Sequence, residues 1–345
     1  MNNMKKFRQI MTILLAAALG AMSLTGCASK QDGTAAASAE PSAKKIRIAL
    51  VQPMSHTSLD QIRDTIVAEL TASGNDFEIV TLNANGDTSA LATILQNEKA
   101  NGTDIIVPIA TSTAQSAKSV FDGTETPIVF AAVSNPVAAG LTGDDCKFIT
   151  GVSNNIPSAE IVKLISNFQP SYQKIGFLYT SSETNSVSTI NAAKEYCDQN
   201  GIAYEEASIA ALTELPAAVN GLLSKGVDAL YTGNDNLIAS GMPAYTDAAY
   251  AKGVPVYCGA DSMVADGGFA TIGVDYVKLG KQVAAMVLKV AAGTAPSELP
   301  YETLSEYAKY VNLQAAERVG LTLTDAMLER YTVLVEKDGT SHFGK

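Results

Sequence analysis

The stretch Ile46–Leu70, IRIALVQPMSHTSLDQIRDTIVAEL, decides how this chain folds. Ile46–Val51 is an aliphatic run of the length and composition typical of a buried strand. A polar loop, Gln52–Ser58, follows it, and from Leu59 to Leu70 the apolar residues recur at helical spacing. A strand that leads through a polar loop into a helix is the repeating unit of a parallel α/β sheet.

The same unit recurs along the chain in two series, separated by a helix-like segment, Ile161–Phe168. Two series predict an α/β fold with two doubly wound parallel-sheet lobes. The further strands predicted for the first series are Phe77–Leu82, Ile105–Ile109 and Pro127–Val133, and those for the second are Lys174–Tyr179, Ala203–Ala207, Asp228–Thr232 and Val254–Cys258.

Several of these strands end in a polar loop that precedes a helix. The carboxyl ends of parallel strands meet at one edge of a sheet, where helix N-termini also present unpaired N–H groups. Two such edges facing each other would form a cleft for a small polar ligand. The alternative for each loop is that its Ser, Thr, Asn or Asp only caps the next helix. The loops are Gln52–Ser58, Thr111–Thr113, Ser134–Pro136, Thr180–Ser186, Gly233–Asn236 and Gly259–Ser262.

Composition excludes several classes of function. The 345 residues include 24 Lys and Arg against 35 Asp and Glu, a net charge of −11 that argues against a nucleic-acid partner. With two His, and with no Cys-x-x-Cys spacing among Cys146, Cys197 and Cys258, we expect no metal site and no disulfide framework. The sequence carries no phosphate-binding, nucleophile-elbow or zinc-protease motif, so we expect no cofactor and no catalysis.

The beginning of the chain carries a targeting signal. Its first eight residues include Lys5, Lys6 and Arg8, and the apolar run Ile10–Ala21 is short for a membrane span. Leu24–Cys27 resembles the lipobox of bacterial lipoproteins, which implies a signal peptide over residues 1–26 and a lipid on the cysteine. Residues 27–44 would form the anchor and a flexible tether rich in Ala and Ser. An ordinary signal peptide with an incidental cysteine is the alternative.

Separated blocks in the body of the chain carry a family resemblance: Thr126–Val133, Thr180–Ser186, Gly233–Ser240, Asp261–Gly268 and Thr271–Tyr276. In this order they resemble ABC-transporter substrate-binding lipoproteins, the family that includes tryptophan/tyrosine-binding proteins. The resemblance implies a type I periplasmic-binding-protein fold, in which three crossovers join two lobes. The first lobe would hold residues 45–153 plus 275–300, and the second residues 154–274 plus 301–345.

The resemblance also implies a ligand site at the loops. Thr111, Ser112 and Thr113 would hold a ligand carboxylate, while Asp235, Asn236 and Asp261 would accept hydrogen bonds from an ammonium group. Glu183, Asn185 and Ser186 would face them from the second lobe. The other candidates are His56, Thr57, Ser58, Ser134, Asn135 and Asn154. His56 either contacts the ligand or caps the following helix.

Two positions depart from the family's pattern. The family commonly has Asp where this chain has Asn135 and Asn154, so the charge pattern of the ligand is open. An aromatic ligand would need flat apolar walls, for which Phe130, Tyr179 and Tyr231 are candidates; the alternative for each is plain core.

These observations favour a monomeric, lipid-anchored receptor on the extracytoplasmic face of the membrane. It would deliver an amino-acid-like ligand, which we expect to be aromatic, to the permease and ATPase subunits of an ABC importer. The sequence leaves two alternatives open: a ligand-sensing subunit of a signalling receptor, and a secreted α/β enzyme.

Overall fold

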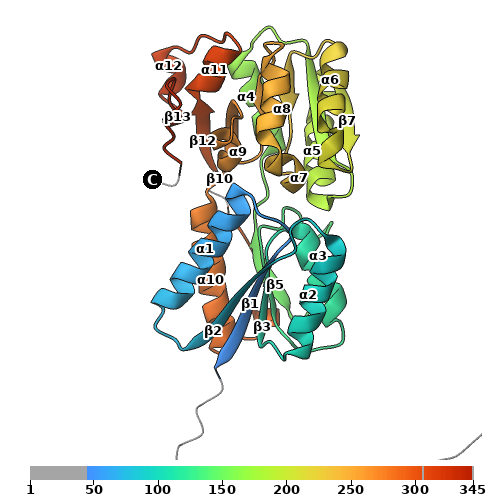
Figure 1. Cartoon of the computed structure of the whole chain (residues 1–345), viewed down its shortest axis with the longest axis vertical. Helices are drawn as coiled ribbons and strands as arrows, with labels where there is room; N and C mark the ends of the chain where they lie inside the picture. Colours follow the sequence, from blue (N-terminus) through green and yellow to red (C-terminus); the bar gives the residue numbers. More distant parts are fainter. Residues whose placement is uncertain (1–44, 305–306, 344–345) are drawn as a thin grey trace, which may run out of the picture. The chain divides into compact units, whose positions relative to one another are not determined.

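The computed structural model describes residues 45–304 and 307–343. The predicted signal peptide, Cys27 and the tether lie outside these residues. The described chain forms two β-sheets, each covered by helices on both faces, which confirms the α/β fold expected from the alternating pattern (Figure 1).

The first sheet has, among the described residues, six parallel strands in the order β11-β5-β4-β3-β1-β2. Helix α1 packs against α10 on one face, and α2 packs against α3 on the other. The strands are β1 (Ile46–Gln52), β2 (Phe77–Asn83), β3 (Ile105–Pro108), β4 (Ile128–Ala131), β5 (Ile149–Ser153) and β11 (Glu302–Thr303), and the helices are α1 (Thr57–Ala72), α2 (Thr88–Ala100), α3 (Thr111–Phe121) and α10 (Tyr276–Ala291).

The second sheet has the order β13-β12-β10-β9-β8-β6-β7. Its strands are β6 (Lys174–Thr180), β7 (Ala203–Ile209), β8 (Ala229–Tyr231), β9 (Val256–Tyr257), β10 (Ala270–Val274), β12 (Tyr307–Asn312) and β13 (Thr332–Val335). Its helices are α4 (Ser158–Phe168), α5 (Thr184–Asn200), α6 (Leu215–Ser224), α7 (Asn236–Ser240), α8 (Met242–Tyr250), α9 (Asp261–Ala265), α11 (Leu313–Arg318) and α12 (Asp325–Leu328), with 3₁₀ turns η1 (Leu212–Glu214) and η2 (Pro296–Glu298).

Two details differ from the sequence-based expectation. Strand β12 runs antiparallel to β10, so the second sheet is mixed rather than purely parallel. Strand β11 pairs with β5 of the first sheet, although residues 301–345 were expected to belong with the second. The chain therefore passes between the sheets after β5, after β10 and after β11. Two-residue strands such as β11 have too few residues to show a hydrophobic period, and only their pairing reveals them.

Contacts of helix α10 stabilise the crossing of the chain from the second sheet back to the first after β10. Asp275 caps its first turn by accepting a hydrogen bond from the backbone N–H of Lys278 at 3.0 Å. Along the helix, Gly280 faces α1 so closely that a Cβ atom there would lie 2.7 Å from the Cβ of Thr65. This close approach lets α10 return to the first sheet and pack against α1.

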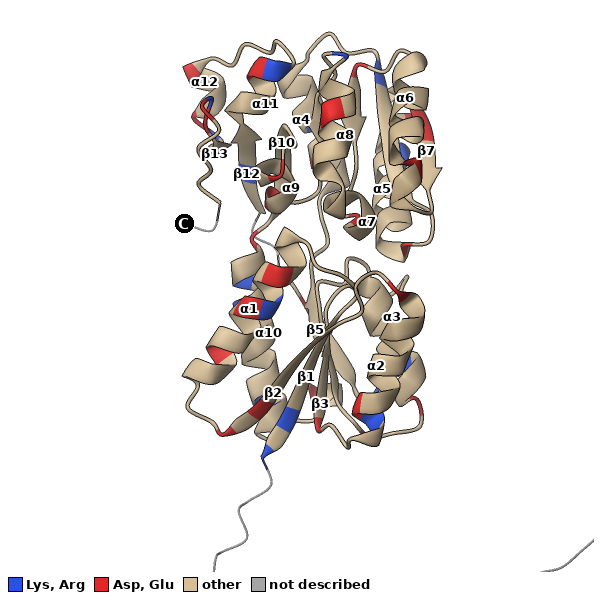
Figure 2. Cartoon of the chain, in the orientation of Figure 1, with Lys and Arg blue, Asp and Glu red and all other residues tan. Residues whose placement is uncertain are grey.

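Lys and Arg residues, coloured blue in Figure 2, occur in both sheets and in helices of both in the described part of the chain.

A glycine in the first sheet provides a test of the packing. A Cβ atom on Gly151 in β5 would lie 2.2 Å from the backbone oxygen of Phe130 in the paired strand β4. We therefore predict that Gly151→Ala lowers the free energy of unfolding by about 1–3 kcal/mol, measured by denaturant titration.

The matched control is Gly221→Ala. Gly221 is an exposed residue within α6, and a Cβ atom there would have nothing within 4 Å. The control should stabilise the protein by about 0.5–1 kcal/mol, because alanine loses less backbone entropy in a helix. Equal effects of the two substitutions would contradict the packing described here.

Candidate functional site

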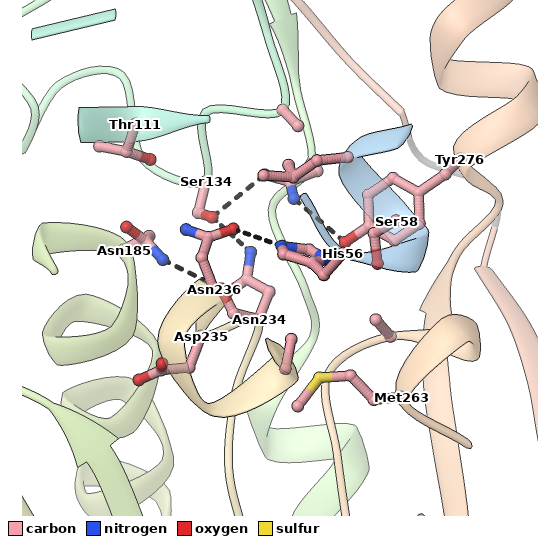
Figure 3. A pocket seen from close by; sticks show the side chains of 15 residues that line it. His56, Ser58, Thr111, Ser134, Asn185, Asn234, Asp235, Asn236, Met263 and Tyr276 are labelled. Atoms are coloured by element: carbon pink, nitrogen blue, oxygen red, sulfur yellow. Dashed lines mark hydrogen bonds between the residues drawn. The ribbon is translucent and has the colours of Figure 1, made fainter. Parts of the chain in front are cut away.

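The carboxyl ends of the strands in the two sheets enclose one small cavity (Figure 3). Its volume is about 20 Å³, which is room for about one water molecule. From the first sheet and its helices it is lined by His56, Ser58, Leu59, Thr111, Ala132, Ser134 and Tyr276. Asn154 lines it from the crossover after β5, and from the second sheet Asn185, Asn234, Asp235, Asn236, Ala239, Ala260 and Met263 complete it.

The cavity is small because side chains of the two sheets bond directly to each other. His56 Nε2 lies 3.1 Å from Asn236 Oδ1. Thr57 Oγ1 donates to Asp266 Oδ2 at 3.0 Å, and the Ser58 hydroxyl pairs with that of Ser262. These contacts connect the N-terminus of α1 with α7 and the α9 region, so they hold the two edges together.

A second set of bonds forms a directed chain through the cavity. The Asn234 amide nitrogen donates to the Ser134 hydroxyl, which donates to Asn154 Oδ1 at 3.1 Å. Asn154 Nδ2 then donates to the phenol oxygen of Tyr276 at 3.3 Å. The other end is anchored in the second sheet, where Thr189 Oγ1 donates to Asn234 Oδ1 at 3.1 Å. The chain links both sheets to the beginning of α10.

Two buried polar atoms of the lining have no partner. They are Thr111 Oγ1 and Asn185 Oδ1, on residues that are 2% and 4% exposed. Thr111 comes from the first sheet and Asn185 from the second, and in Figure 3 the Asn185 oxygen lies on the side that faces Thr111. A buried polar atom without a hydrogen bond costs about 1–3 kcal/mol, so a ligand that bonded to these atoms would remove that cost.

The backbone beside Thr111 is strained. Ala110 and Ala132, at the ends of β3 and β4, have φ angles of 75° and 58°, a region that non-glycine residues rarely occupy. Ala110 also holds the N-cap position of α3, where its side chain cannot accept from the first-turn N–H groups. The uncapped end of α3 therefore has donors for an anionic group. Strain of this kind clusters at functional sites.

Asp235 lines the cavity, but its carboxylate is already occupied by its own sheet. It is fully buried and accepts from the backbone N–H of Thr180 at 2.6 Å, the Thr180 hydroxyl at 2.8 Å and the backbone N–H of Ile238 at 2.9 Å. The Ser186 hydroxyl is a fourth donor. Burial nevertheless raises the pKa of Asp235. The role of this carboxylate is to join β6, α5 and α7.

Glu183 lies immediately behind the cavity rather than in its lining. Its Oε2 accepts from Asn185 Nδ2 at 2.9 Å and Asn236 Nδ2 at 2.7 Å, and its Oε1 accepts from the backbone N–H of Leu237 at 3.0 Å. Burial, followed by the charge of Asp235, raises the pKa of Glu183 to about 7.

Other predicted site residues also lie outside the lining. Asn135 Nδ2 donates to Ser188 Oγ at 3.3 Å, a further contact between the sheets. Asp261 begins α9, where its Oδ1 accepts from the backbone N–H of Ser262 at 2.7 Å, and burial raises its pKa to about 7. The predicted residues outside the lining are Thr57, Ser112, Thr113, Asn135, Glu183, Ser186 and Asp261.

The alternative in which the His56 side chain caps the following helix is wrong. The residue occupies the N-cap position of α1, but its side chain caps nothing and instead reaches Asn236 across the cavity. Burial lowers the pKa of its imidazole.

The aromatic residues considered as ligand walls do not line the cavity. Phe130 and Tyr231 are fully buried in the cores, and half-buried Tyr179 packs against a core. The large apolar side chains in the lining are Leu59, Met263 and Tyr276, which the sequence did not single out. Asn234 was missed as well, although it and Tyr276 lie within the blocks that carry the family resemblance.

Within residues 45–304 and 307–343, no helix is long and apolar enough to cross a bilayer. The same residues contain no group of three or more His, Cys, Asp or Glu arranged to hold a metal ion.

Several known proteins are similar to this chain in sequence and structure. A tyrosine-binding protein of Clostridioides difficile is 30% identical over 319 residues, covering 90% of this chain and 91% of that protein. The crystal structure of an ABC domain in complex with L-Trp from Streptococcus pneumoniae is 31% identical, with a TM-score of 0.79 over 84% of this chain and 99% of that one.

A substrate-binding protein with adhesive properties from Clostridium difficile, in its ligand-free, open structure, is 30% identical. Its TM-score is 0.63 over 83% of this chain and 98% of that one, so this structure superposes better on the L-Trp complex. The family model described as ABC transporter substrate binding protein matches residues 47–334. With this match over most of its length, the chain belongs to the ABC transporter substrate-binding protein family, a family of binding proteins rather than enzymes.

Proposed function

We propose that this protein captures an aromatic α-amino acid between its two sheets and delivers it to the permease and ATPase of an ABC importer. It works on the extracytoplasmic face of the membrane, anchored by a lipid on Cys27. Membership of the substrate-binding family supports the transport role.

The unpartnered pair Thr111 and Asn185 carries this proposal. The Thr111 hydroxyl and the uncapped N-terminus of α3 supply hydrogen-bond donors, which suit a carboxylate. Asn185 Oδ1 supplies an acceptor from the opposite sheet, which suits an ammonium group. The two poles of an α-amino acid are attached to one carbon, so adjacent donor and acceptor groups are what such a ligand requires.

Ligand entry requires the sheets to separate. Ligand pockets typically have volumes of about 300–1,000 Å³, far more than the cavity of about 20 Å³ seen here. An entering amino acid would replace direct bonds such as that between His56 and Asn236. It would then bridge the two edges and shift the population towards a ligand-bound closed state.

The preference for an aromatic side chain is supported by the relatives, whose names record tyrosine binding and an L-Trp complex. In this chain Leu59, Met263 and Tyr276 provide the large apolar surface of the lining. Asn154 presents a neutral amide at a position where an acid is common in the family, and Asn135 lies outside the lining. The ammonium group therefore depends on acceptors of the second sheet.

A substitution at Thr111 tests the site. Wild-type protein should bind L-tyrosine or L-tryptophan with one-to-one stoichiometry in isothermal titration calorimetry. Thr111→Val keeps the side-chain shape and removes the hydroxyl, so binding should weaken by about 1.5–3 kcal/mol, the usual contribution of a hydrogen bond to a charged group.

The matched control is Thr113→Val. Thr113 is fully buried in the same helix and its hydroxyl also lacks a partner, but it does not line the cavity. This variant should bind like wild type. The proposed site would be refuted if the wild-type protein bound neither amino acid, or if the two variants lost the same amount of binding affinity.

The anchor is tested separately with Cys27→Ser in a bacterial host that processes lipoproteins. The variant should move from the membrane fraction to the soluble extracytoplasmic fraction, because serine cannot receive the thioether-linked lipid. Its affinity for the amino acid should not change. Retention of the variant in washed membranes would show that Cys27 does not anchor the protein.

A further inference from the structure

We propose that Glu183 is the positioning residue of an ammonium-binding pole, which it builds by orienting the amides of Asn185 and Asn236. This inference rests on the proposed function and assigns the part of the site that recognises the ligand's amino group.

The orientation follows from hydrogen-bond chemistry. An ionised carboxylate only accepts hydrogen bonds, so the amide atoms facing Glu183 Oε2 at 2.9 Å and 2.7 Å must be the NH₂ groups of Asn185 and Asn236. The Asn185 NH₂ group is held further by the backbone oxygen of Asn234 at 2.9 Å. Each amide therefore presents its oxygen away from Glu183.

Both oxygens are placed to serve a cation. Asn185 Oδ1 is buried, lacks a partner and belongs to the cavity lining. Asn236 Oδ1 faces His56 across the cavity (Figure 3). Because the NH₂ group of Asn236 is occupied by Glu183, its oxygen is the acceptor and His56 Nε2 is the donor in this contact. A ligand ammonium can take the place of that donor.

Glu183 also supplies the charge that this pole needs. The cavity lining contains no Lys or Arg, and burial lowers the pKa of its histidine, His56. The lining's acid, Asp235, has its carboxylate saturated by Thr180, Ser186 and Ile238. The side-chain amides of Asn185 and Asn236 separate the Glu183 carboxylate from the cavity, and the carboxylate polarises the oxygens of both amides. A buried ammonium is costly without such a compensating charge.

The titration of Glu183 agrees with this role. Its pKa of about 7 means that the carboxyl gains its charge as the pH rises from 6 to 8. The titratable groups facing it are Asp235 and, through Asn236, His56. A bound ammonium favours the ionised form, so affinity for an amino acid should increase over this pH range.

The test compares ligands with and without the amino group. Calorimetry would measure the affinity for L-tyrosine and for its deaminated analogue, 3-(4-hydroxyphenyl)propanoate, with L-tryptophan and 3-(indol-3-yl)propanoate as a second pair. Glu183→Gln should weaken binding of the amino acids about tenfold or more, and binding of the analogues less than about twofold. It should also flatten the pH dependence between pH 6 and 8.

Asn185→Ala removes a proposed acceptor and leaves the hydrogen bonds between Glu183 and α7 in place. It should likewise weaken binding of the amino acids more than binding of the deaminated analogues. The matched control is Glu195→Gln, which removes the same charge from an exposed position of α5 and should change neither affinity.

Equal losses for amino acid and analogue would mean that Glu183 is only structural, and unchanged binding would mean that it plays no part; either result overturns the inference alone. Failure of the wild-type protein to bind any of the amino acids would overturn the proposed function as well.

Discussion

The site depends on one constraint: polar side chains buried between two sheet edges must each find a hydrogen-bond partner. With room for about one water molecule, they find partners in each other, as His56 does with Asn236 and Ser134 with Asn234. Thr111 Oγ1 and Asn185 Oδ1 are left over. These two atoms are the unpartnered ones that also line the cavity, and this coincidence is why we propose the ligand site there.

This arrangement makes ligand binding a competition. The direct bonds between the edges stabilise closure by themselves, so a ligand contributes only the difference between its own contacts and those that it replaces. The better superposition on the L-Trp complex than on the open, ligand-free relative agrees with a closed arrangement. Substitutions that weaken the contact between Thr57 and Asp266, outside the cavity lining, would shift the opening equilibrium without removing a ligand contact.

Much of this architecture could be predicted from the sequence, because strand and helix periods are local properties. The predicted loops lie at the edges where the two sheets meet, and His56, Thr111, Asn185 and Asn236 line the cavity there. The β11 pairing escaped prediction because a strand of two residues shows no period, and the antiparallel direction of β12 escaped it because strand direction depends on tertiary contacts.

The direction of single side chains could not be predicted. Asp235 and Asn234 are neighbours in one loop, yet the acid turns into its own sheet to join three elements while the amide reaches Ser134 in the other sheet. Composition favours the acid as a ligand for ammonium, but a carboxylate that already accepts four hydrogen bonds is not available. Similarly, Phe130 and Tyr231 lie near the loops in sequence, and burial in the cores removes them from the site.

The most direct measurement is a crystal structure of the protein grown with L-tyrosine or L-tryptophan. We expect the ligand between the two edges, with its carboxylate at Thr111 and the N-terminus of α3 and its ammonium at Asn185 and Asn236, the bond from His56 to Asn236 being displaced. A ligand bound elsewhere, with the direct bonds between the edges intact, would contradict the account.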